Sequence, residues 1–140
     1  MKWQITALKV LLVMICVVNL TLGVLAFTSK PLILKAIDTI YGVQLTEIAE
    51  HTNYIIKMLG CFLIAISVMA GLAARDPLQN KIVIYGNSIW LALRGIQRIT
   101  YVERFHQDWG IPYVNLWGQV IIVFAYAIAL YLLIPKKSEA

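Results

Sequence analysis

Polar and aromatic residues within the stretch 81–101 have the types and spacing to bind an anionic or carbonyl-bearing group. Asn87 and Arg94 are seven residues apart and therefore lie on one face of a helix, with Trp90 and Gln97 on the same face. Arg98 follows one helical turn after Arg94. A guanidinium presents its donors in a planar fork that matches carboxylates and phosphates. We therefore predict a ligand- or lipid-binding site formed by Arg94, Asn87, Trp90, Gln97 and Arg98.

A second interpretation of Arg94 is structural. No Asp or Glu lies within the core of any apolar run, so no carboxylate is expected to meet this guanidinium at its own depth. A long cationic side chain in a membrane extends toward the nearer surface and anchors its helix there. The possible partners of Arg94 are then the outer acids, backbone carbonyls, Asn19 or Gln119, a lipid phosphate, or a ligand.

The histidines and cysteines offer less chemistry. His51 follows Glu47 by four residues, so the two could pair or share a metal, and His106 lies near Glu103 and Asp108 in a loop predicted at 102–112. We interpret both histidines as solvated interface residues and assign no metal site and no cofactor. The two cysteines, Cys16 and Cys61, lie inside apolar runs. This position favours two small buried side chains over a disulfide or a zinc site.

The composition places these residues in a membrane. Of the 140 residues, 61% are hydrophobic and only 14% are charged, with a mean hydropathy of +0.79, whereas soluble domains have about 45–50% apolar and about 25% charged residues. The basic residues behind the net charge of +5 lie mostly at the ends of apolar runs. We interpret them as membrane anchors and not as a surface for nucleic acid.

Four apolar runs predict an all-α integral membrane protein, a four-helix transmembrane bundle in one domain of residues 1–140. The run before Arg94 is short for a crossing. Without a crossing there, however, its neighbours would need an irregular connection inside the lipid, which the bilayer does not tolerate. The predicted spans are about 5–27, 47–74, 81–101 and 113–134, with Thr46 as a cap of the second.

The segment 31–41 predicts a short amphipathic helix in the first outer loop. Ser29 suits its N-cap, Pro31 its first turn and Gly42 its C-terminal exit. The helix is expected to lie on the outer membrane surface or against a partner protein. Its apolar face would hold Ile33, Leu34, Ile37, Ile40 and Tyr41, opposite Lys35 and Asp38.

The basic residues near the span ends predict that both termini lie in the cytoplasm, in the cytoplasmic membrane. With four spans, the side of the termini holds Lys2, Arg75, Lys81, Lys136 and Lys137, and the opposite side holds Lys30, Lys35, Arg98 and Arg104.

Lines of small and polar residues predict the faces on which the spans pack. Their spacing alternates between three and four, which favours left-handed packing at shallow angles. The first line is Lys9, Leu12, Cys16, Asn19, Gly23 and Ala26; the second is Lys57, Gly60, Ile64, Ser67 and Gly71; that of the last span is Asn115, Gly118, Ile122, Ala125 and Ala129.

The arrangement as a whole resembles small bacterial membrane proteins of the BphX-like and DoxX-like type. The likeness rests on a short basic start, a first loop reaching Ile40-Tyr41-Gly42, a glycine-containing second span ending in Ala73-Ala74-Arg75-Asp76-Pro77, and a third span with an arginine. It implies a four-helix bundle in the cytoplasmic membrane, and some members of such families look like accessory partners of redox enzymes. The segment 102–112, rich in charged and aromatic residues, departs from that pattern and suggests a docking surface.

Two classes of function remain, neither of them enzymatic. The sequence has no nucleophile elbow, no HExxH, no P-loop, no CxxCH and no acid within a span. The first class is a non-catalytic membrane subunit that packs in a larger assembly and holds partners, lipid, quinone or pigment. The alternative is a free-standing carrier of a hydrophobic or anionic compound. The expected partners are membrane lipids and other membrane subunits.

Overall fold

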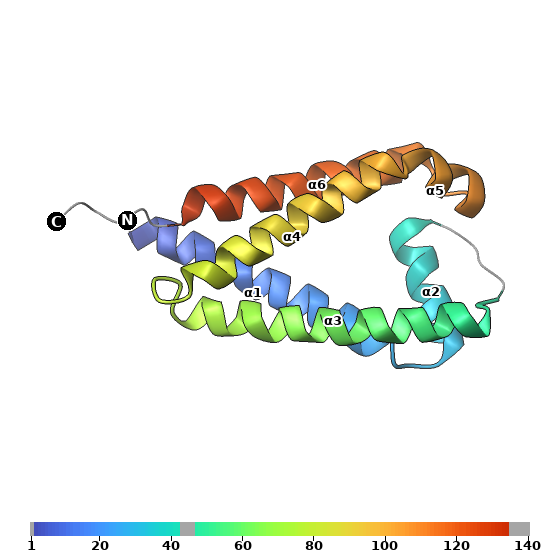
Figure 1. Ribbon diagram of the computed structural model, residues 1–140, viewed down its shortest axis with the longest axis horizontal. Helices are drawn as coiled ribbons and strands as arrows, with labels where there is room; N and C mark the ends of the chain where they lie inside the picture. Colours follow the sequence, from blue (N-terminus) through green and yellow to red (C-terminus); the bar gives the residue numbers. More distant parts are fainter. Residues whose placement is uncertain (1, 43–46, 135–140) are drawn as a thin grey trace.

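The computed structural model describes residues 2–42 and 47–134, and these residues form helices and no strands. The all-α prediction is therefore confirmed. The helices are α1 (Lys2–Leu25), α2 (Lys30–Tyr41), α3 (Glu50–Arg75), α4 (Lys81–Thr100), α5 (Val102–Trp109) and α6 (Tyr113–Leu133) (Figure 1).

Helices α1 and α3 form one tightly packed pair. A Cβ added to Gly60 would lie 2.6 Å from the Cβ of Ala26, and one added to Gly23 would lie 2.7 Å from Cγ1 of Ile64. The hydroxyl of Ser67 donates a hydrogen bond of 2.8 Å to the carbonyl of Cys16. Since the missing side chains let the two backbones approach, the packing faces predicted for the first two spans are confirmed at Gly23, Gly60 and Ser67.

Helices α4 and α6 form the second pair, and here the predicted face of the last span is wrong. The Ser88 hydroxyl donates 2.8 Å to the carbonyl of Ala127, and Gly95 lies directly against the ring of Phe124. A Cβ added to Gly118 of the predicted line would meet no atom within 4 Å, and Ile122 is exposed. The serine and glycine of this interface come from α4, and the buried residues of α6 are Leu116, Val120 and Leu130 together with the smaller Ala127.

The two pairs meet at one end of the molecule and separate toward the other. The shared end holds the start of α1, the turn between α3 and α4, and the end of α6, whereas α2 and α5 lie at the opposite end (Figure 1). The apolar core at the shared end comprises Leu8, Leu12, Ile15, Ala70, Ala73, Ile84, Leu91, Ala127, Leu130 and Ile134. Because this core holds only one end together, space opens between the pairs at the other.

Three helices of the described residues, α1, α3 and α6, are long and apolar enough to cross a membrane, one fewer than the four predicted. Helix α4 begins where predicted, at Lys81, but lacks the required hydropathy. The reason is its content of Asn87, Arg94, Gln97 and Arg98. Helix α3 begins at Glu50 after Ala49 as its N-cap, later than the predicted 47, and Thr46 lies outside the described residues.

The short helix of the first loop is confirmed as α2, with Ser29 before it, Pro31 in its first turn and Gly42 at its end. Gly42 has a φ of +70°, which favours glycine. The loop predicted at 102–112 is wrong, because α5 occupies Val102–Trp109. Gly110, with a φ of +65°, ends that helix, and Pro112 precedes α6. Val102, Phe105 and Trp109 have the helical spacing i, i+3 and i+7, so the sequence does contain a signal for this helix.

Candidate functional site

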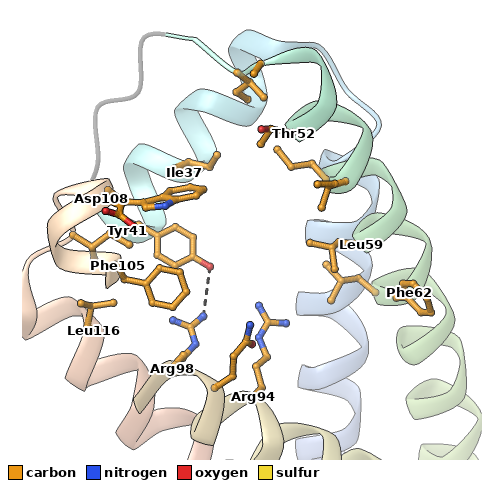
Figure 2. A pocket seen from close by; sticks show the side chains of 18 of the residues that line it. Ile37, Tyr41, Thr52, Leu59, Phe62, Arg94, Arg98, Phe105, Asp108 and Leu116 are labelled. Atoms are coloured by element: carbon orange, nitrogen blue, oxygen red, sulfur yellow. Dashed lines mark hydrogen bonds between the residues drawn. The ribbon is translucent and has the colours of Figure 1, made fainter. Parts of the chain in front are cut away.

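A cleft of about 1200 Å³ lies between α3 and α4 where the two helix pairs separate. Helices α2 and α5 close the end of the cleft that lies away from the shared apolar core, which we call its outer end. Figure 2 shows Ile37, Tyr41 and Phe105 at this end. From Ile55 to Ile66 the wall formed by α3 is apolar and includes Ile55, Ile56, Leu59, Phe62, Leu63 and Ile66, whereas His51 and Thr52 of the same helix line the cleft nearer the start of α3. A wall of this kind accepts hydrocarbon and gives it no polar partner.

The opposite wall, on α4, is cationic. Arg94 and Arg98 are one helical turn apart, and both extend from α4 into the cleft (Figure 2). The guanidinium of Arg94 lies 5.3 Å from the centre of the Trp90 ring, a cation–π distance. Within the described ranges Arg94 forms no ion pair with a carboxylate. Its charge therefore faces a largely apolar space.

Arg98 combines a place in the cleft with a structural role. It donates hydrogen bonds to the side-chain oxygen of Gln119 on α6 and, at 3.5 Å, to the hydroxyl of Tyr41 on α2. The amide nitrogen of Gln119 donates to the carbonyl of Ile40 at 3.2 Å, and that of Asn115 donates to the carbonyl of Tyr41 at 3.2 Å. These bonds fix the C-terminal end of α2 to the α4–α6 pair.

The N-terminal end of α2 is held by the other pair. Lys30 forms an ion pair of 3.1 Å with Glu50 at the start of α3, and both side chains are well exposed to their surroundings. An exposed ion pair contributes little to stability, so the bonds at the C-terminal end of α2 dominate. Helix α2 thus connects the two helix pairs across the outer end of the cleft.

Replacing Gln119 with leucine should release the C-terminal end of α2. The change removes both the Arg98–Gln119 bond and the bond to the Ile40 carbonyl, which together represent about 2–4 kcal/mol. Hydrogen exchange of the α2 amides should then become at least about tenfold faster. Gln79→Leu, in the exposed turn before α4, is the matched control. Equal exchange in the two variants would show that α2 is held by other contacts.

Acidic and imidazole groups lie at the outer end of the cleft. Glu47, His51 and Asp108 all line it, but in the described part of the chain no hydrogen bond joins Glu47 to His51. His106 differs from the predicted solvated residue: it is half-buried, its Nδ1 lies 2.9 Å from the carbonyl oxygen of Ile111, and its ring contacts Tyr113. Among residues 2–42 and 47–134, no three His, Cys, Asp or Glu side chains are grouped to hold a metal ion.

The predicted site residues divide between two hollows. Trp90, Arg94, Gln97 and Arg98 line the cleft. Asn87 lies deeper, in an adjoining hollow of about 350 Å³ that shares Ile66 and Trp90 with the cleft. Its amide nitrogen donates 2.9 Å to the Val83 carbonyl, while its buried oxygen has no partner among the residues that the structure describes.

Residues beyond the predicted set complete the cleft. Tyr41 and Gln119 orient Arg98, and Phe105 and Trp109 of α5 close the outer end. The sequence indicated Tyr41, because this residue belongs to the apolar face predicted for the helix 31–41. The sequence suggested Gln119 only as one possible partner of Arg94, and the structure pairs it with Arg98 instead.

No family model, no curated protein and no solved structure matches this chain. The resemblance to BphX-like and DoxX-like proteins stays a prediction.

Proposed function

We propose that the protein crosses the cytoplasmic membrane four times, with α4 as the additional crossing. Helix α4 has 20 residues, about 30 Å at 1.5 Å per residue, which matches the hydrocarbon thickness of a bilayer. It packs along α6, itself long and apolar enough to cross. A neighbour of this kind supports polar residues at membrane depth when they face protein or a cavity.

We infer that the cleft holds an amphipathic molecule taken from the surrounding bilayer. The observation that carries this proposal is the cleft itself, which combines the apolar wall of α3 with the guanidiniums of Arg94 and Arg98. A cationic group in apolar surroundings is costly unless an anion or a strong acceptor meets it. A molecule with a polar head and an apolar body satisfies both walls.

The proposed role is non-catalytic, as a subunit of a larger membrane assembly. The polar groups that extend from α4 into the cleft are guanidinium and amide groups, beside the apolar Leu93 and the Trp90 ring. They donate hydrogen bonds and, at ordinary pH, neither attack a substrate nor carry a proton. Large apolar side chains of α1, α3 and α6 face away from the rest of the chain, among them Val17, Val68 and Ile121. Such faces are covered by lipid or by neighbouring membrane proteins.

The four-crossing arrangement predicts which positions share a side of the membrane. In a variant without Cys16 and Cys61, single cysteines at Ser29 and Gln107 should react with a membrane-impermeant maleimide on intact cells. A cysteine at Gln79 should react only after permeabilisation, because the positive-inside rule places the α3–α4 turn in the cytoplasm. Labelling of Gln107 and Gln79 from the same side would exclude α4 as a crossing.

Extraction in a mild detergent tests the binding proposal. The native mass of the purified chain should exceed its 15.8 kDa by that of a molecule that partitions into organic solvent and is released on unfolding. A native mass equal to the bare chain, with the helices intact by circular dichroism, would contradict the proposal.

A further inference from the structure

We propose that the polar head bound in the cleft is a phosphate group of a membrane phospholipid, held by Arg94 and Arg98, with an acyl chain lying between α3 and α4. This inference rests on the proposed function, since it names the chemical class of the molecule in the cleft.

The spacing of the two arginines suits one tetrahedral anion. Residues four apart on a helix have Cβ atoms about 5–6 Å apart, so two long side chains on one face can reach the same group. Each guanidinium has five donors. Arg98 uses two of them, on Gln119 and Tyr41. Arg94 lies over the Trp90 ring and has no ion pair in the described part of the chain. Enough donors remain for two or more phosphate oxygens.

The hydrogen bonds of Arg98 prepare it for this task. Tyr41 and Gln119 hold its guanidinium from α2 and α6, so binding a headgroup immobilises less side chain. Asp108 also lines the cleft, but Figure 2 places it beside Ile37 and Tyr41, across the open space from Arg94. The acid is therefore at the outer end of the cleft and the cations are deeper.

The apolar extension below the arginines distinguishes a lipid from a free anion. The hollow that shares Ile66 and Trp90 with the cleft is lined by apolar side chains such as Met69 and Val83. From Phe62, at about the level of Arg94 in Figure 2, to Met69 the wall formed by α3 runs about 10 Å at 1.5 Å per residue. This is about a third of a hydrocarbon core of about 30 Å, so it can line the first part of one acyl chain. A free phosphate ion would leave this wall without a partner.

The test compares two lipids with the same acyl chains, one with and one without a phosphate-containing headgroup. Delipidated protein in detergent is titrated with a phosphatidylglycerol, with a diacylglycerol of the same chains, and with inorganic phosphate, and binding is read by native mass spectrometry. The phospholipid should bind at least about tenfold more tightly than the diacylglycerol, the scale expected for charged hydrogen bonds. Millimolar inorganic phosphate should not displace it.

Variants assign the effect to Arg94. Arg94→Gln should remove most of the difference in affinity between the phospholipid and the diacylglycerol, the remainder coming from Arg98. Arg94→Lys should lose part of this difference, because a point charge does not reproduce the planar fork. Arg104→Gln is the matched control, since this exposed arginine lies over Tyr101 outside the cleft. If Arg94→Gln is poorly folded, the decision rests on Arg94→Lys, for which unchanged affinity would overturn the proposal.

The possible failures are distinguishable through Ile66→Trp, which narrows the cleft without changing charge. If both lipids bind equally and Arg94→Gln has no effect, yet Ile66→Trp removes binding, the phosphate inference is wrong while the cleft still binds amphipathic molecules. If inorganic phosphate displaces the phospholipid, the site recognises a free anion and the inference is also wrong. If Ile66→Trp leaves all binding unchanged, the proposed function itself fails.

Discussion

Replacing Gly60 with leucine should separate α1 from α3 and lower the free energy of unfolding by at least about 3 kcal/mol, the upper part of the usual range for overpacking. Even the first carbon of the new side chain would lie 2.6 Å from the Cβ of Ala26 and 3.0 Å from the carbonyl oxygen of Gly23. The latter is a backbone atom, which cannot move unless the helix moves. Thermal unfolding in detergent, followed by circular dichroism, measures the effect.

Gly118→Leu and Gly86→Leu are the controls for this prediction. Both glycines lie within helices, and a Cβ added to either would meet no atom within 4 Å. Since leucine has a higher helix propensity than glycine, these variants should be as stable as the parent chain or slightly more so. A loss of stability equal to that of Gly60→Leu would show that the α1–α3 approach is not a special constraint.

The sequence was sufficient to predict the helices apart from α5, and the packing faces of the first two spans. Length and apolar content identify the long segments, and glycines at matching positions in two neighbouring spans identify where their backbones approach. Ser29 and Pro31 mark the start of α2 and Gly42 marks its end, which is sufficient to predict this helix. These features depend on a few neighbouring residues, which is why a single sequence contains them.

The cleft could not be predicted, because it depends on how two helix pairs diverge. Trp90, Arg94, Gln97 and Arg98 were recognisable as one group, but their opposite wall on α3 reads as an ordinary apolar span. The face of α6 was predicted wrongly for a related reason. Its small residues suggested a close approach, whereas the structure places Ser88 and Gly95 of α4 in that position.

Filling the cleft should remove its ligand without unfolding the protein. Ile66 lines both the cleft and the hollow beyond it, so tryptophan at this position projects a large ring into the space assigned to the apolar body of the ligand. Val68 lies two residues further along α3 and is exposed, so Val68→Trp adds the same ring to a surface expected to face lipid. A position two residues away points to a different side of the helix.

Native mass spectrometry of these two variants beside the parent chain tests the central claim most directly. We expect the parent chain and Val68→Trp to retain a bound amphipathic molecule and Ile66→Trp to lose at least about nine-tenths of it, with equal helical content in all three. For a site that is mostly occupied in the parent chain, this loss requires an affinity about a hundredfold weaker. Equal retention by Ile66→Trp and Val68→Trp would contradict the assignment of the cleft as the binding site.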